Sequence, residues 1–267
     1  MTTFLITGAT GRLGGAALRS LTAQVTAADV HALVRSRNAA TRLSAGGSTA
    51  HVADYSDPDG LVRAFTGIDR LLFVSSPVLD PAIRGAQHRA VVESARAAGV
   101  QHIVYTSAMG APHDPGHTAA EVALAEGGVS HTILRNALYT DPFITRALED
   151  ARCGVVRSAS ENHPIVTASV ADLADAAVAA LLAPPERALW ELRGPSWTFD
   201  GLAEVLSRLT GRVIRHENVA DAETGPFAAL FPLVRRGVFA AETTDLGTIL
   251  SRRPRTIEAV ATDQLRG

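Results

Sequence analysis

The sequence predicts an α/β fold, with a doubly wound parallel sheet in its first half and a small C-terminal α/β lobe after it. Apolar runs of strand length recur along the first half of the chain, separated by helix-like stretches: 3–7, 30–34, 49–53, 70–75, 102–107 and 131–135. This alternation is typical of parallel strands joined by crossover helices. Most of the runs are apolar throughout, as expected of strands that helices cover on both faces.

A glycine turn directly after the first run is the most informative segment. Glycines stand at positions 8, 11 and 14, between the apolar run 4–6 and a helix-like stretch from Leu13 to Leu21. A helix start offers unpaired backbone N–H groups and a partial positive charge, and glycines let phosphates approach the backbone closely. Strand, glycine turn and helix in this order predict a Rossmann dinucleotide site, with the pyrophosphate at the turn.

Bulk composition limits the partners and the location. The 267 residues carry a formal net charge of −2 and a hydrophobic content of 46%, which predicts a globular chain without a nucleic-acid partner. No apolar run has the length of a membrane span and the N-terminus lacks the pattern of a leader, so we expect a cytoplasmic protein without membrane contact. The single cysteine, Cys153, excludes an internal disulfide and any multi-cysteine metal site.

The end of the second run indicates which nucleotide is bound. An NAD site normally places an acidic residue there, which binds the ribose hydroxyls. Here the segment His31–Arg37 contains arginines and no acid, while Asp29 lies at the other end of the strand. Arg35 and Arg12 can clamp a 2′-phosphate, because the planar guanidinium pairs well with phosphate oxygens. We therefore expect NADP(H) rather than NAD(H); the alternative for each arginine is a solvated surface charge.

Two further strand ends should line the same site. Asp54 and Tyr55 follow the third run and can contact adenine. Val74, Ser75 and Ser76 end the fourth run, where the chain must pass the ribose and the nicotinamide. Both assignments rest on position, because the carboxyl ends of parallel strands meet at one edge of a sheet.

The regular alternation fades after residue 135, which divides the chain. We expect residues 1–135 to form the NAD(P)-binding domain and residues 136–267 to form a smaller substrate-binding lobe. Segment 163–183 should return to the first domain. The lobe should cover the carboxyl edge of the sheet and form the substrate pocket, since ligands of open sheets bind outside that edge.

Local signals predict several further elements. A helix over 87–98 should end at Gly99, which suits a glycine C-cap. A capping box at 169–172 should open a helix that runs to Leu182 and stops at Pro184-Pro185. In the lobe we predict a helix, a short strand and a helical tail, at 201–209, at 213–216 and after residue 243.

Segments spread over nearly the whole chain carry a family resemblance: ITGATGRLG, ALVRS, HVADYSDPDGLVRAFTGIDRLLFVSSP, HIVYTSA, HTILRNALY, LRGPSWTFDGLAEVLSRLTGR and TDLGTILSRRPRTI. Together they resemble the NmrA-like, atypical short-chain dehydrogenase/reductases, most closely the NAD(P)H:quinone oxidoreductase type 2 branch. The resemblance implies a monomeric or homodimeric reductase that passes hydride from NADPH to a quinone-like small molecule. It equally allows a redox sensor that binds NADP without turning it over.

By position, the resemblance implies that the glycine turn and the strand ends hold the cofactor. The residues concerned are Gly8, Ala9, Thr10, Gly11, Arg12, Leu13, Arg35, Asp54, Tyr55, Val74, Ser75, Ser76 and Asn136. Ser107 ends the fifth run, where catalytic members of the superfamily keep a serine.

The chain departs from the superfamily in its basic residues. All 25 of them are arginine, so the usual Tyr-x-x-x-Lys pair, whose lysine lowers the pKa of the tyrosine, cannot operate. The corresponding positions hold His113 and His117. His117 can hydrogen-bond ribose or a substrate oxygen, and the alternative is a loop histidine at a helix start. Two histidines without a third ligand predict no metal site.

Asn136 and Tyr139 follow the sixth run and should face the nicotinamide. Tyr139 can donate its phenolic proton to a quinone oxygen as hydride arrives, or it can simply pack against the ring. Quinone reduction needs orientation, a dry pocket and a hydrogen-bond donor, because the hydride chemistry belongs to the cofactor. Tyr139, His117 and Ser107 are therefore the candidate catalytic residues.

Two functions stay open at this point. The first is an NADPH-dependent reductase of quinones or related enones, and the second is a non-catalytic NADP(H)-binding regulator. A reductase needs a closed apolar pocket, whereas a regulator needs an exposed patch for a protein partner. The apolar stretch Pro226–Ala241 can serve as a pocket wall or as an interaction helix.

Overall fold

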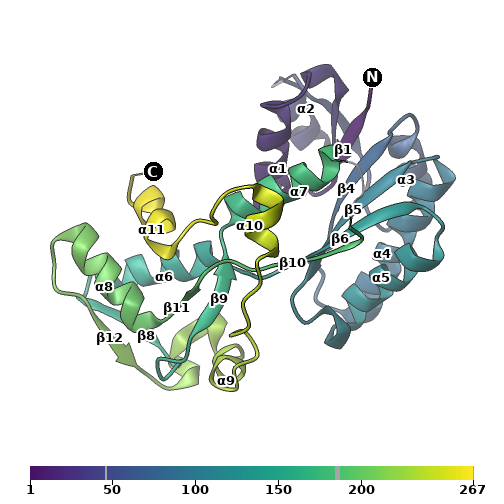
Figure 1. Ribbon diagram of the computed structural model, residues 1–267. Helices are drawn as coiled ribbons and strands as arrows, with labels where there is room; N and C mark the ends of the chain where they lie inside the picture. The colour runs from purple at the N-terminus through teal and green to yellow at the C-terminus, as the bar shows by residue number, and fades with distance from the viewer. Residues whose placement is uncertain (46, 184–186, 267) are drawn as a thin grey trace. The chain divides into compact units, whose positions relative to one another are not determined.

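The computed structural model describes residues 1–45, 47–183 and 187–266. The chain forms two compact units (Figure 1). Unit 1 comprises Met1–Asn136 and Leu173–Glu191, and unit 2 comprises Ala137–Asp172 and Leu192–Gly267. The segment that returns to unit 1 thus begins at Leu173, later than residue 163, because the preceding strand pairs within unit 2.

A seven-stranded sheet forms the centre of unit 1, in the order β10-β6-β5-β4-β1-β2-β3. The strands are β1 (Phe4–Ile6), β2 (Val30–Val34), β3 (Thr49–Val52), β4 (Arg70–Val74), β5 (His102–Ala108), β6 (Ser130–Asn136) and β10 (Leu189–Leu192). β1 to β6 pair in parallel, so the predicted doubly wound sheet is confirmed, and all six predicted strands are present. Strand order reverses on either side of β1, which places a topological switch point at its carboxyl end.

Helices connect the strands of this sheet. They are α1 (Arg12–Thr22), α2 (Arg37–Ala45), α3 (Pro58–Phe65), α4 (Pro81–Ala97), α5 (Pro115–Glu126) and α7 (Val170–Leu182), with short 3-10 turns at η1 (Ala27–Asp29) and η2 (Ala111–His113). Three of them begin with the same dipeptide, Asp-Pro, at 57–58, 80–81 and 114–115. The aspartate accepts hydrogen bonds from the first-turn N–H groups, and the proline supplies a helical φ without needing a partner.

These caps change one predicted boundary. The helix expected over 87–98 begins at Pro81, because Asp80 caps it there, and it ends at Ala97 before Gly99 at φ 81°. The helix expected from Ser169 ends at Leu182, and the predicted stop at Pro184-Pro185 lies outside the described residues. Among the described residues, no helix is long and apolar enough to cross a membrane.

Unit 2 contains two small sheets. One has the order β11 (Ser196–Trp197), β9 (Ile165–Ala168), β7 (Leu138–Tyr139), and the other pairs β12 (Arg215–Asn218) in parallel with β8 (Val155–Ser158). The helical segments are α6 (Thr140–Ala151), α8 (Phe199–Thr210), η3 (Asp221–Phe227), α9 (Phe231–Arg235), α10 (Asp245–Leu250) and α11 (Ile257–Arg266). The predicted lobe helix and helical tail are present, and the short strand begins at Arg215 instead of Val213.

The C-terminal tail of unit 2 is held by a buried carboxylate. Asp172 is fully buried and accepts hydrogen bonds from the Arg252 guanidinium at 2.7 Å and from the Arg255 backbone N–H at 2.6 Å. Its own N–H donates to the Ser169 hydroxyl at 3.0 Å, as the predicted capping box requires. The Asp172 side chain thus anchors a segment that is distant in sequence.

The glycine turn brings helix α1 against the end of β1. Gly8 has a φ of 59°, a left-handed conformation that favours glycine. A Cβ on Gly14 would lie 2.3 Å from the Gly8 carbonyl oxygen and 2.9 Å from the Thr7 carbonyl oxygen. Both obstacles are backbone atoms, so only glycine at position 14 permits this approach.

Gly14→Ala should therefore destabilise the protein. We expect a loss of about 2 kcal/mol, the range of an overpacked core, and a fall in melting temperature of about 4–8 °C. Thermal unfolding measures this effect. Gly201→Ala is the matched control, because a Cβ there meets only the Thr198 hydroxyl oxygen, at 3.4 Å. Equal effects of the two substitutions would contradict the close approach at Gly14.

Candidate functional site

Hydroxyl groups join the ends of β1 and β4 to the loop after β3. The Tyr55 hydroxyl oxygen lies 2.6 Å from both the Thr7 hydroxyl oxygen and the Val74 carbonyl oxygen. The Thr7 hydroxyl also accepts the Val74 N–H at 2.8 Å. Burial raises the pKa of Tyr55 above its usual value, so the phenol stays neutral. The Tyr55 hydroxyl thus holds strand ends together, and only its half-buried ring is left for the predicted adenine contact.

The turn that leads into α1 presents backbone, not side chains, to a ligand. Gly11 caps the helix and makes no side-chain cap hydrogen bond, while its N–H donates to the Gly8 carbonyl at 2.8 Å. Gly8, Thr10 and Gly11 are exposed. Ala9 and Leu13 are buried in the core, so these two can contact a cofactor only through their backbone. The arrangement is that of an anion site at a helix start.

Arg12 and Arg35, the predicted phosphate clamp, are both exposed. Arg12 opens α1 and Arg35 directly follows β2. The positive charge of Arg35 acts to lower the pKa of Tyr55, against the larger effect of burial. Because Arg35 directly follows β2, the residue lies at the carboxyl edge of the sheet, the edge at which a nucleotide phosphate would bind.

The loops after β3 and β4 differ in what they expose. Asp54 is exposed, and its carboxylate accepts the Ser56 N–H at 2.9 Å. The Ser75 N–H donates to the Thr106 hydroxyl at 3.1 Å. Ser76 is buried, and its hydroxyl donates to the Gln87 side chain at 2.6 Å. The Ser76 side chain is therefore turned toward α4, and a cofactor contact at this position falls to its backbone.

Ser107 belongs to a polar cluster that sequence reasoning did not find. Its hydroxyl donates to Glu121 at 2.7 Å, and Arg135 binds the same carboxylate through two nitrogens, at 3.1 and 2.6 Å. Arg135 also binds Glu191 at 3.1 Å. Burial would raise the pKa of Glu121, but hydrogen bonds from Arg135 and Ser107 lower it below its usual value. The Ser107 hydroxyl donates its hydrogen bond to the anionic Glu121 carboxylate. Toward a ligand, the Ser107 oxygen can therefore act only as a hydrogen-bond acceptor.

His117 and His113 lie in different environments. His117 is buried in the first turn of α5, and its Nδ1 lies 2.7 Å from the Tyr105 hydroxyl oxygen. Burial lowers the pKa of His117, so it is neutral near pH 7. His113 is exposed and ends η2. No group of three or more potential metal ligands occurs among the described residues.

Asn136 is the last residue of β6 and Tyr139 lies three residues further on, but the two belong to different units. Asn136 is buried, and its Oδ1 has no hydrogen-bond partner within the described part of the chain. A buried acceptor without a partner is costly, so an ordered water or a bound ligand would have to supply the donor. The amide and hydroxyl groups of a nicotinamide riboside provide such donors. Tyr139 is half-buried and precedes α6 in unit 2.

Unit 2 contains a Ser–His–Asp chain that the sequence did not reveal. Ser158 Oγ lies 2.8 Å from His216 Nε2, and His216 Nδ1 lies 2.6 Å from Asp200. This connectivity is that of a hydrolase triad. Ser158 is 0% exposed and also hydrogen-bonds Ser160, so its hydroxyl is closed to a substrate. The chain of bonds instead links the paired strands β8 and β12 to the start of α8.

The apolar stretch Pro226–Ala241 contributes mainly to the core of unit 2. Phe231, Val234 and Phe239 are buried, and Phe227 stacks on Phe143 at 4.6 Å between ring centroids. The cavity beside these rings measures about 10 Å³, which is room for one water molecule and not for a quinone. Packing within unit 2 therefore accounts for Phe227, Phe231, Val234 and Phe239, whereas Val238 is exposed.

The fold and the carboxyl edge of unit 1 define a dinucleotide-binding α/β protein. A family model described as NAD(P)H-binding matches residues 8–184. Quinone oxidoreductase 2 of Escherichia coli is 36% identical over 225 residues, which cover 82% of this chain and 78% of that relative.

Two solved structures are similar over nearly the full length. Citrobacter sp. triphenylmethane reductase complexed with NADP(H) is 31% identical with a TM-score of 0.90, covering 98% of this chain and 99% of that one. The NADPH complex of E. coli quinone oxidoreductase 2 is 29% identical with a TM-score of 0.87, covering 98% and 100%. The chain therefore belongs to the NAD(P)H-binding, NmrA-like family, and it is an oxidoreductase similar to quinone oxidoreductase 2.

Asn136→Leu should show whether the Asn136 side chain contributes to the stability of the folded protein or to the binding of NADPH. Because the acceptor has no partner among the described residues, its removal should leave the melting temperature of the cofactor-free protein unchanged or raise it. The increase in melting temperature that NADPH causes should shrink, since ligand stabilisation follows affinity. An undiminished increase would show that Asn136 does not face the cofactor.

Stability should also fall as the pH drops below about 6.5, because two buried histidines resist protonation. Burial lowers the pKa of His88 to about 4 and that of His102 to about 4. The unfolded chain takes up these protons from about pH 6.5 downward, so stability is complete above that value and is lost progressively toward pH 4. Between pH 7.5 and 5.5 we expect a loss of about 1 kcal/mol from each of the two histidines.

Urea unfolding at the two pH values, with His88→Gln and His102→Gln alongside, measures these contributions. Each substitution should flatten the pH dependence, because glutamine does not titrate. A pH dependence identical to that of the wild-type protein in both variants would contradict neutral burial.

Proposed function

We propose that the chain passes hydride from NADPH to a quinone or a related electrophilic carbonyl or enone. The observation that carries the proposal is the exposed start of α1, which has no side-chain cap, at the switch point of the sheet, together with the exposed Arg12 and Arg35. The similarity to E. coli quinone oxidoreductase 2 supports the choice of acceptor.

The residues present fit a dinucleotide. The backbone of 8–13 would hold the pyrophosphate, the backbone of 74–76 would lie along the ribose, and Asn136 would accept a hydrogen bond from the nicotinamide end. When bound, the cofactor supplies the hydride, so the protein's work is orientation and the exclusion of water. Within the described residues the buried Asn136 Oδ1 has no hydrogen-bond partner, so this acceptor is open to a donor from the cofactor.

The proton that accompanies hydride transfer has two candidate donors. His117 is neutral and accepts a hydrogen bond at Nδ1 if Tyr105 donates, which leaves a proton on Nε2. Tyr139 is the second candidate, with the alternative that its ring only packs against a substrate. The Ser107 hydroxyl already donates a hydrogen bond to Glu121, so its role toward a ligand would be to accept a hydrogen bond.

A non-catalytic NADP(H)-binding regulator is the second candidate function. The absence of lysine from the sequence favours it, because the superfamily's usual catalytic pair cannot form. Such a regulator needs an exposed patch for a protein partner. Burial of Phe231, Val234 and Phe239 weighs against Pro226–Ala241 as that patch.

NADPH oxidation followed by absorbance, with a panel of benzoquinones and naphthoquinones, separates the two functions. The reductase should give turnover that saturates with quinone and prefers NADPH to NADH. Fluorescence titration with NADPH runs beside it. Tight NADPH binding without turnover of any acceptor would contradict the reductase and support the regulator.

Arg35→Asp should move the preference from NADPH toward NADH. We expect the ratio of the two catalytic efficiencies to fall at least tenfold, because a carboxylate repels the 2′-phosphate and can bind the ribose hydroxyls. Arg37→Asp is the matched control: it lies two residues further on, is also exposed, and opens α2. A ratio that moves equally in both variants would indicate general electrostatics and contradict the clamp.

A further inference from the structure

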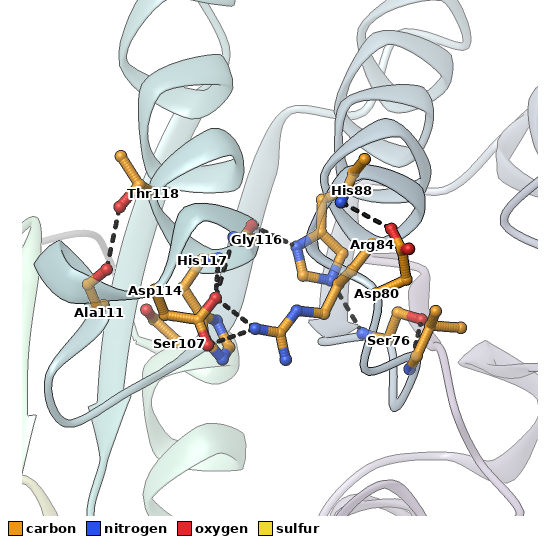
Figure 2. A network of polar contacts seen from close by, with 12 residues as sticks. Ser76, Asp80, Arg84, His88, Ser107, Ala111, Asp114, Gly116, His117 and Thr118 are labelled. Carbon is orange, nitrogen blue, oxygen red and sulfur yellow. Dashed lines mark hydrogen bonds and ion pairs between the residues drawn. The ribbon is translucent and has the colours of Figure 1, made fainter.

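One buried imidazole joins two of the segments that build the candidate site. His88 lies in α4 and is 0% exposed. Its Nε2 lies 2.9 Å from the backbone nitrogen of Ser76, in the loop after β4. Its Nδ1 lies 3.0 Å from the carbonyl oxygen of Gly116, in the first turn of α5 (Figure 2). The His88 ring thus sets the distance between the loop after β4 and the start of α5.

The two backbone partners determine the protonation of the ring. The Ser76 nitrogen is a donor, so Nε2 of His88 must accept and cannot carry a proton. The Gly116 oxygen is an acceptor, so Nδ1 must carry the proton. His88 is therefore neutral, in its Nδ1–H form, and each ring nitrogen has one defined task.

The tautomer of His88 also determines the tautomer of His117. The Tyr105 hydroxyl oxygen lies 3.3 Å from Nδ1 of His88 and 2.7 Å from Nδ1 of His117. Because Nδ1 of His88 carries the proton that it donates to Gly116, it cannot accept a hydrogen bond from Tyr105. Among the described residues, Nδ1 of His117 is then the acceptor within reach of the Tyr105 hydroxyl, which donates its hydrogen bond there. His117 then carries its proton on Nε2. Through Tyr105, the state of His88 makes His117 a hydrogen-bond donor at its other nitrogen.

A charged clamp supports the same junction. Arg84, one turn before His88 in α4, binds both carboxylate oxygens of Asp114 (Figure 2). Asp114 in turn accepts the N–H groups of Gly116 and His117 at 2.9 and 3.2 Å, which caps α5. The positive charge of Arg84 opposes protonation of both His88 and His117, with burial the larger cause of their lowered pKa values. The negative charge of Asp114 acts in the opposite direction, so burial is the main reason that both rings stay neutral.

We infer that His88 is a positioning residue of the cofactor site: it fixes the backbone at Ser76 against the first turn of α5 and holds His117 as a neutral Nε2–H donor. The inference rests on the proposed function, since it assigns the Ser76 loop to the ribose and nicotinamide. His88 itself is closed to solvent and acts only through Ser76, Gly116 and Tyr105.

Two substitutions of His88 test the hydrogen bonds of its two ring nitrogens separately. In His88→Asn the amide nitrogen can replace Nδ1 and donate to Gly116, but nothing reaches Ser76. In His88→Gln the longer side chain can place its amide oxygen where Nε2 was and accept from Ser76. We expect His88→Asn to raise the Kd for NADPH, measured by fluorescence titration, at least fivefold. His88→Gln should recover most of that loss.

Control variants and a spectroscopic measurement distinguish positioning from stability. His102→Asn and His102→Gln remove another buried histidine, which hydrogen-bonds Ser130 and Thr132 at the amino end of β5 and β6. They should lower the melting temperature without changing NADPH affinity. In the cofactor-free wild-type protein, imidazole ¹⁵N shifts should report Nδ1–H for His88 and Nε2–H for His117.

Three results would count against the inference. Equal weakening of NADPH binding in His88→Asn and His88→Gln, in proportion to their loss of melting temperature, would make His88 merely structural. An Nε2–H tautomer of His88 would contradict the geometry without touching the proposed function. Absence of NADPH binding by the wild-type protein would overturn the proposed function, and with it the cofactor role of His88.

Discussion

The contact between helix α1 and the end of strand β1 is the constraint on which the candidate site depends. Because Gly14 has no side chain, helix α1 can pack closely against the Gly8 carbonyl oxygen, and Gly8 itself has a left-handed backbone conformation. The Tyr55 hydroxyl then joins Thr7 and Val74, so that the ends of β1 and β4 are held in one place. A helix start, a switch point and two strand ends thus meet at one edge, which is where a dinucleotide site forms in this kind of sheet.

Neutral polar groups, not ion pairs, organise the interior beside that edge. His88, Tyr105 and His117 form a chain in which each donor meets an acceptor, and burial keeps all three uncharged. The charged partners lie further out: Arg84 holds Asp114, and Arg135 holds Glu121. This separation suits hydride chemistry, because a neutral, dry surrounding disfavours competing proton transfers to water. Because His88, Tyr105 and His117 are neutral, the hydrogen bonds that they make depend on which atom carries each proton.

Local sequence signals predicted most of the fold of unit 1, because its strands are apolar runs between capped helices. β10 was missed because Leu189–Leu192 is short and mostly half-buried, without the continuous apolar character of the other strands. At the candidate site, the glycine turn and the two arginines carry local signals. The bonds of Tyr55, Ser76 and Ser107 do not, because their partners are distant in sequence. His88 has no local signal at all: it is one polar residue inside a helix, and only the tertiary structure gives its ring two backbone partners.

Binding of NADPH along the carboxyl edge of the unit 1 sheet can be mapped by amide NMR. A ¹⁵N-labelled protein would be titrated with NADPH and its amide shifts followed residue by residue. If NADPH binds at this edge, the largest changes should occur at residues 8–13, at Arg35, at 74–76 and at Asn136, with little change at the amino ends of the strands. Changes concentrated at those amino ends or confined to unit 2, with the glycine turn unaffected, would contradict it.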